Sequence, residues 1–169
     1  MRILPSLLLA LAATPALAAQ LNVEVEIPRM NVAEYHRPYV AVWVEGPDKR
    51  VAANLAVWYA GHLRNNEGVT WLKDLRQWWR RIGREVQVPM DGVTSATRAP
   101  GRHQLSFSEG SAPLGKLAPG NYRLQVEASR EVGGRELLGI DFTWPPKQSR
   151  QLAVKGEHEL GQIVLTLKP

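Results

Sequence analysis

The chain has 169 residues, enough for one domain with a sizeable hydrophobic core, and it contains no cysteine. The lack of cysteine excludes disulfides, thiol catalysis, haem attachment through cysteine and cysteine-bound iron–sulfur clusters. The formal net charge of +5 favours a phosphate-bearing ligand or an acidic partner.

Residues 1–18 have the pattern of a Sec signal peptide. Arg2 supplies a positive charge, residues 7–13 are apolar, and Ala16-Leu17-Ala18 is typical of a cleavage site. We expect cleavage after Ala18 or Ala19; the alternative is a buried N-terminal helix. No later segment is apolar enough to span a membrane, so we expect a soluble periplasmic protein that meets little nucleic acid.

The rest of the chain, residues 20–169, is predicted to be one domain of short strands separated by turns. Residues 21–27 alternate between apolar and polar, whereas residues 39–45 and 54–59 are apolar on both faces, as central strands of a sandwich are. Further strands are predicted at residues 85–88, 103–108, 121–128, 137–144, 150–154 and 161–167. Turn residues separate them at 46–48, 119–121, 133–134 and 145–146.

One amphipathic helix is predicted among the strands, at about residues 70–83. Apolar side chains recur there at helical spacing: Trp71, Leu72, Leu75, Trp78, Trp79 and Ile82. Thr70 is the expected N-cap, and Gly83 is the expected end. Several strands with one inserted helix predict a mainly β protein, an immunoglobulin-like β-sandwich.

The apolar face of this helix allows two compatible interpretations. It covers one end of the sandwich as part of the core. Alternatively, Trp78 or Trp79 forms an aromatic wall for a planar ligand such as a flavin. The opposite face carries Lys73, Arg76, Arg80 and Arg84, solvated charges that lie close in sequence to the loop described next.

The segment Asp91–Gly101 contains the most informative motif of the sequence. Asp91-Gly92 alone is a hairpin signal, because glycine tolerates the positive φ of a tight two-residue turn. That interpretation leaves Thr94-Ser95-Ala96-Thr97 unexplained. The sequence DGVTSAT resembles the D-x-x-[S/T]-G-A-T motif at which periplasmic FMN transferases attach flavin to threonine. Proteins that contain that motif include the FMN-binding subunits of sodium-pumping quinone reductases and related electron-transfer complexes.

The resemblance implies that Thr97 carries FMN through a phosphoester bond to its hydroxyl. Asp91, Thr94 and Ala96 match the motif, whereas Ser95 stands where the motif has glycine. A threonine hydroxyl is a weak nucleophile, so its attachment to FMN needs a separate transferase with a metal and a base. The side chains of Arg98, Arg102 and His103 are the expected partners of the phosphate.

A second resemblance covers almost the whole of residues 20–169. The segments YVAVWVE, WLKDLRQWW, DGVTSATRAPG and LAPGNYRLQVEASRE are similar to a family of small, uncharacterised bacterial periplasmic proteins. Members are sometimes labelled as related to the flagellar hook-capping protein. We attribute that label to a P-G-x-Y-x-L hairpin, here Pro119 to Leu124, which is generic to Ig-like domains and indicates no flagellar role. The family resemblance implies association with membrane flavin or iron-reduction systems.

Other motifs give no further function. The sequence has no dinucleotide-binding or Walker loop, no serine-hydrolase elbow and no metal-ligand spacing among His36, His62, His103 and His158. Two functions therefore compete. One is a periplasmic electron carrier with FMN on Thr97, modified by an FMN transferase and serving a membrane redox partner, without being a stand-alone enzyme. The other is a cofactor-free Ig-like binding or accessory module whose basic helix face docks an acidic partner.

Overall fold

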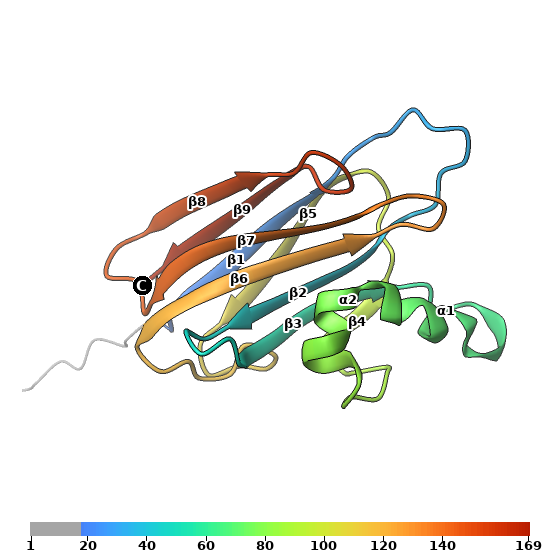
Figure 1. Cartoon of the computed structure of the whole chain (residues 1–169). Coiled ribbons are helices and arrows are strands. Elements are labelled where there is room, and N and C mark those ends of the chain that lie inside the picture. Colours follow the sequence, from blue (N-terminus) through green and yellow to red (C-terminus); the bar gives the residue numbers. More distant parts are fainter. Residues whose placement is uncertain (1–17) are drawn as a thin grey trace, which may run out of the picture.

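The computed structural model describes residues 18–169, so residues 1–17 of the predicted signal peptide lie outside it. Two β-sheets pack face to face, with short helices on one side (Figure 1). The strands are β1 Gln20–Ile27, β2 Tyr39–Glu45, β3 Val51–Tyr59, β4 Thr94–Ala96, β5 Gly101–Ser108, β6 Gly120–Ser129, β7 Arg135–Trp144, β8 Arg150–Lys155 and β9 Gln162–Lys168. The mainly β sandwich predicted from the sequence is confirmed.

The strand order identifies the sandwich as immunoglobulin-like. One sheet has the order β5-β1-β9-β8 and the other β4-β3-β2-β6-β7. Strands β1, β2, β3, β5, β6 and β7 thus follow strands B, C, C′, E, F and G of a variable-type immunoglobulin domain. The place of strand A, beside B, is taken by β9 near the C-terminus, which pairs antiparallel with β1. The first and last strands of the fold therefore lie side by side in one sheet.

A tyrosine corner supports the same comparison. The Tyr122 hydroxyl, near the start of β6, donates a hydrogen bond of 2.7 Å to the Ala118 carbonyl four residues upstream. This is the arrangement found where strand F of an immunoglobulin domain begins. The segment from Pro119 to Leu124 was expected to be a hairpin. It is instead the corner at which the chain crosses from β5 in one sheet to β6 in the other.

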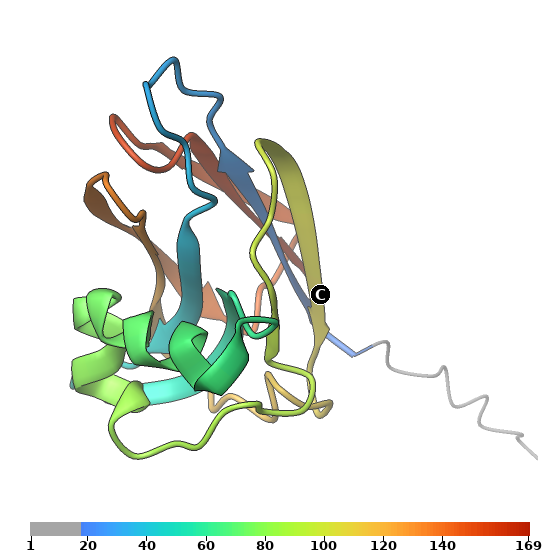
Figure 2. The same ribbon diagram turned by 90° about the vertical axis from the view of Figure 1, so that its right-hand side faces the viewer.

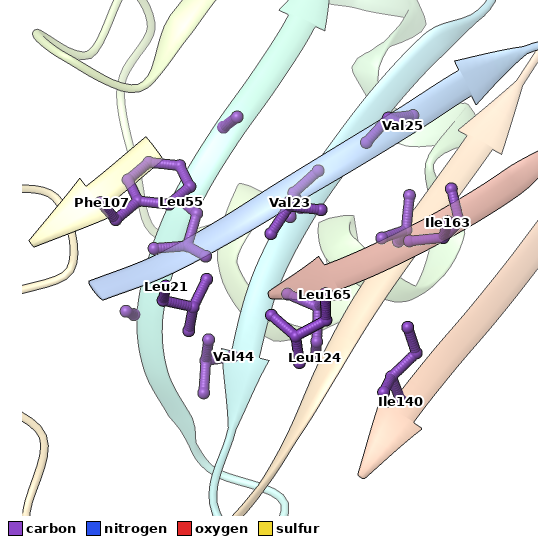
Figure 3. Packing of buried hydrophobic residues seen from close by; sticks show 14 of the residues in the cluster. Leu21, Val23, Val25, Val44, Leu55, Phe107, Leu124, Ile140, Ile163 and Leu165 are labelled. Carbon is purple, nitrogen blue, oxygen red and sulfur yellow. The ribbon is translucent and has the colours of Figure 1, made fainter. Parts of the chain in front are cut away.

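The main core lies between the sheets and follows the predicted alternation. Leu21, Val23 and Val25 of β1 belong to one cluster with Val44 of β2 and Leu55 of β3, and Leu21 lies nearest to the last two (Figure 3). All five side chains are buried, because alternate residues of a strand point to the same face. This packing stabilises the sandwich without disulfides.

A second core covers the outer face of the five-stranded sheet. Ala41 and Trp43 of β2 point away from the other sheet and pack with Leu72, Leu75 and Trp78 of the helical region. Figures 1 and 2 show the helices α1 (Glu67–Thr70) and α2 (Arg76–Trp78) lying against this face. Strands β2 and β3 are therefore buried on both faces, as their continuous apolar sequences predicted.

The helical region is not the single helix predicted at residues 70–83. It comprises 3₁₀ turns at Arg64–Asn66 and Trp71–Asp74, the helices α1 and α2, and a π-helical turn at Trp79–Gly83. Leu75, with φ −74° and ψ 72°, interrupts it. Thr70 has helical dihedrals and makes no capping bond, so its predicted N-cap role is wrong.

The predicted end of the helical region at Gly83 is confirmed. A Cβ atom at Gly83 would lie 2.4 Å from Cε3 of Trp79 and 2.7 Å from Cζ3 of Trp78, so only glycine allows both indoles to pack there. Residues 85–88, predicted as a strand, connect this end to the following turn without strand structure. Val86 and Val88 instead pack against the second core from this connection.

The break at Leu75 is explained by a buried carboxylate on β6. Glu127 accepts hydrogen bonds from the backbone N–H groups of Gln77, at 3.0 Å, and Trp78, at 2.7 Å. It is 0 % exposed, and its charge is balanced by Arg135 of β7. Glu127 thus caps the start of α2 from a distant strand.

Replacing Glu127 by alanine should lower the free energy of unfolding by about 2–4 kcal/mol, because two helical N–H groups and Arg135 lose a charged acceptor. Urea unfolding followed by tryptophan fluorescence measures the change. The exposed Glu85 is the matched control, and Glu85→Ala should alter stability by less than about 0.5 kcal/mol. Equal effects of the two substitutions would show that Glu127 does not anchor the helical region.

Candidate functional site

The motif DGVTSAT lies at the edge of the five-stranded sheet. Its first residues form a turn, with Gly92 at φ +71° and the Met90 carbonyl accepting from the N–H groups of Val93 and Thr94. The chain then forms β4, which pairs parallel with β3. The turn at Asp91-Gly92 is therefore confirmed. The hairpin interpretation is wrong, because residues 85–90, directly before the turn, form no strand, and β4 pairs parallel with β3.

The hydroxyl of Thr94 closes this turn. It accepts from the Met90 N–H and donates to the Met90 carbonyl, both at 2.9 Å. Ser95 is half-buried, and its hydroxyl has one long contact of 3.4 Å from Nη2 of Arg98. Asp91 and Ala96 are exposed. Thr94 therefore has a structural role that fixes the segment leading to Thr97.

The segment after β4 packs over a buried indole. The Arg98 guanidinium lies 5.4 Å from the ring centroid of Trp58, and the His103 ring meets the same indole edge-on at 5.6 Å. Nε2 of His103 lies 2.8 Å from the Ala99 carbonyl. These contacts hold the connection between β4 and β5 against the open edge of the sandwich.

Thr97 lines a groove of about 1000 Å³, which we call the Thr97 groove. Its other walls come from the segment before β2, the helical region and the β6–β7 connection. They include Tyr35, Arg37, Tyr39, Trp71, Arg76 and Arg130. Thr97 is half-buried, and its hydroxyl makes no hydrogen bond to another side chain or backbone group within residues 18–169. The groove volume falls in the usual range for small-molecule sites.

Some residues predicted for this site lie elsewhere. Arg102 is exposed on β5, where its Nη1 lies 3.5 Å from Oε1 of Glu24 on the neighbouring strand β1, on the outer face of the four-stranded sheet. Trp78 is wholly buried and donates its indole N–H to Asn54, so it has no face open to a ligand. Trp79 is half-buried and does not line the groove. The aromatic side chain that the helical region contributes to the groove is Trp71, which is 42 % exposed.

A buried ion pair stabilises the wall formed by the β6–β7 connection. Arg130 binds Glu159 through Nε at 2.8 Å and Nη2 at 3.2 Å. The loop that carries Glu159 is fixed by Glu136, whose carboxylate accepts the N–H groups of Glu157, His158 and Leu160. Burial raises the pKa of Glu136, but these bonds outweigh it, so its pKa lies below the ordinary value.

Tyrosines contribute a less polar part of the groove. The Tyr39 hydroxyl donates to the Gly68 carbonyl at 3.0 Å, which ties β2 to α1. Burial raises the pKa of both Tyr35 and Tyr39, so both hydroxyls are protonated hydrogen-bond donors at neutral pH. By contrast, Arg37 and Arg76 are exposed and make no ion pair with the described residues. The groove thus combines aromatic faces, the hydroxyl of Tyr35 and two free guanidinium groups.

A family model described as "Predicted periplasmic protein (DUF2271)" matches residues 20–162. The chain belongs to this family. Membership places it in the periplasm, in agreement with the signal peptide expected from the sequence. No curated protein and no solved structure matches the chain. No helix within residues 18–169 is long and apolar enough to cross a membrane.

Most residues that surround Thr97 in this member of the family were not predicted from its sequence. No sequence motif includes Tyr35, Arg37 or Arg130, and these residues reach the groove from segments far from Thr97 in the chain. Signals were present for Arg76, which belongs to the charged face described above, and for Trp71. Trp71 adjoins Leu72 in the apolar pattern, and two successive helical residues cannot both point at the centre of the core.

Thr94→Val keeps the shape of the side chain but removes both bonds to Met90. It should lower the free energy of unfolding by about 1–2 kcal/mol, because the Met90 N–H loses its acceptor and the hydroxyl bond to the carbonyl is lost. Thr94→Ser retains the hydroxyl and should recover most of the loss. Ser95→Ala is the control, with an expected change below about 0.5 kcal/mol. Thermal unfolding measures all three, and a neutral Thr94→Val would contradict the structural role.

Proposed function

We propose that this periplasmic protein carries FMN on the hydroxyl of Thr97 and acts as an electron carrier. The observation that supports this most is the division of roles within DGVTSAT. The Thr94 hydroxyl is bonded within the turn, whereas Thr97 lines a groove of cofactor size and its hydroxyl has no hydrogen-bond partner among residues 18–169. The resemblance of the motif singles out the same threonine as the acceptor.

The groove has chemistry that fits FMN. The free guanidinium groups of Arg37 and Arg76 suit a phosphate, which arginine binds through charge-assisted hydrogen bonds. Trp71 offers an exposed indole, and Tyr35 and Tyr39 add further ring surface. When attached, the flavin supplies the redox chemistry, and the protein positions it and shapes its electrostatic surroundings.

The attachment step needs an enzyme other than this chain. The Thr97 oxygen forms a new bond to the flavin-side phosphorus, and its proton passes to a base of the transferase. Because water is a poor leaving group, the donor must be a flavin pyrophosphate such as FAD, whose P–O–P linkage breaks and releases AMP. A bound metal of the transferase would stabilise the charge on that leaving group. The small side chains of Ser95 and Ala96 leave room for the transferase beside Thr97.

A second function, docking of an acidic partner without a cofactor, is favoured by the surface of the helical region. Lys73, Arg76, Arg80 and Arg84 are all exposed there. Such a surface would steer an acidic protein toward the helices. Docking of an acidic protein on this surface is compatible with electron transfer, because a redox partner must also dock. The presence or absence of attached flavin therefore distinguishes the two functions.

Co-expression with an FMN transferase in a periplasm should raise the intact mass of the mature protein by one FMN less water. Thr97→Val, which keeps the side-chain shape, should abolish the increase. Ser95→Ala is the matched control, since it removes a neighbouring hydroxyl and should retain the adduct. An adduct on Thr97→Val would refute the assignment to Thr97. An unmodified wild-type protein beside an active transferase would favour the cofactor-free function.

A further inference from the structure

Apolar side chains gather at the Thr97 groove. Four large apolar residues are exposed within residues 18–169, and Leu63, Trp71 and Val132 among them line this groove. Exposed apolar groups that cluster around a cavity are typical of a binding surface. The indole of Trp71 is the largest of them and can stack on a planar ring.

Unsatisfied donors lie at the same place. Within residues 18–169, three buried side-chain atoms lack a hydrogen-bond partner, and two of them, the Tyr35 hydroxyl and Nη1 of Arg130, belong to groove residues. Arg130 is 8 % exposed, and its guanidinium carbon lies 5.9 Å from the centre of the Tyr35 ring. A buried donor without an acceptor is costly, so two beside one groove indicate that an acceptor from a ligand completes them.

The β6–β7 connection, which carries Arg130, is strained. Val132 has φ +52°, a conformation that β-branched residues rarely adopt, and its side chain is 70 % exposed. Gly133 packs on the Arg130 guanidinium, where a Cβ atom would come within 2.4 Å of Cζ. Backbone strain of this kind concentrates at ligand clamps, and relief of it by a small shift would open the donors to the groove.

We propose that the Thr97 groove binds the planar ring of a flavin non-covalently, with Trp71 as the stacking surface and Tyr35 and Arg130 as donors to the ring carbonyls. An isoalloxazine ring combines an apolar end with a carbonyl-bearing end, which matches the apolar rim and the two unsatisfied donors. The inference rests on the proposed function for the identity of the ring. It extends that function, because it assigns the residues that hold the ring after attachment at Thr97.

The test uses ¹⁵N-labelled protein from a host without an FMN transferase, so that Thr97 is unmodified, titrated with free FMN by NMR. Saturable shifts are expected at the indole N–H of Trp71. A dissociation constant as weak as about 1 mM suffices, because a tether supplies millimolar effective concentration. Trp71→Ala should weaken binding about tenfold and Trp71→Phe much less.

Tyr35→Phe separates ligand binding from folding. It should weaken FMN binding about three- to tenfold, yet leave thermal stability unchanged or higher, because it removes a hydroxyl that has no partner in the free protein. Lys73→Ala, exposed on the helical region but outside the groove, should bind FMN as the wild type does. Inorganic phosphate alone should not shift Trp71.

Three outcomes would overturn the inference: no saturable FMN binding, unchanged affinity in both Trp71→Ala and Tyr35→Phe, or phosphate reproducing the shifts. Its failure is distinct from failure of the proposed function. If a transferase attaches FMN to Thr97 but the groove does not bind free FMN, only the inference is refuted. If the groove binds free FMN but no transferase modifies Thr97, only the proposed covalent attachment is refuted.

Discussion

The hydrogen bonds that the buried carboxylate of Glu127 accepts from the backbone N–H groups of Gln77 and Trp78 anchor the helical region on the five-stranded sheet. They lie directly after the interruption of the helical region at Leu75. Trp78, after the break, is wholly buried, whereas Trp71, before it, reaches the surface. The same carboxylate pairs with Arg135, a groove residue, which links core packing to the walls around Thr97.

The segment around Thr97 is held on both sides while its own hydroxyl stays free. Before it, Thr94 closes the turn and β4 pairs with β3. After it, Arg98 and His103 pack on Trp58. Because the backbone around Thr97 is already held in place, it loses little conformational entropy when an enzyme binds it. This arrangement suits a residue that another protein must recognise.

The sequence predicted most of the sandwich but little of the groove. Alternation in residues 21–27 and the two-faced apolar strands at 39–45 and 54–59 are local signals, and they identified buried strands correctly. The break at Leu75 could not be predicted, because its cause, Glu127, is about fifty residues away in the chain. The valines of residues 85–88 gave a strand-like pattern, yet they pack on the second core from a connection. Likewise, the motif singled out Thr97, but Tyr35, Arg37 and Arg130 join it only through the fold.

Whether Thr97 carries flavin in the cell is tested most directly by peptide mass spectrometry of the protein isolated from its own periplasm. Trypsin should release residues 85–98, a peptide that contains Thr94, Ser95 and Thr97 together. We expect this peptide with the mass of one FMN less water added, and fragment ions that place the addition on Thr97. An unmodified peptide, or an addition on Thr94 or Ser95, would contradict it.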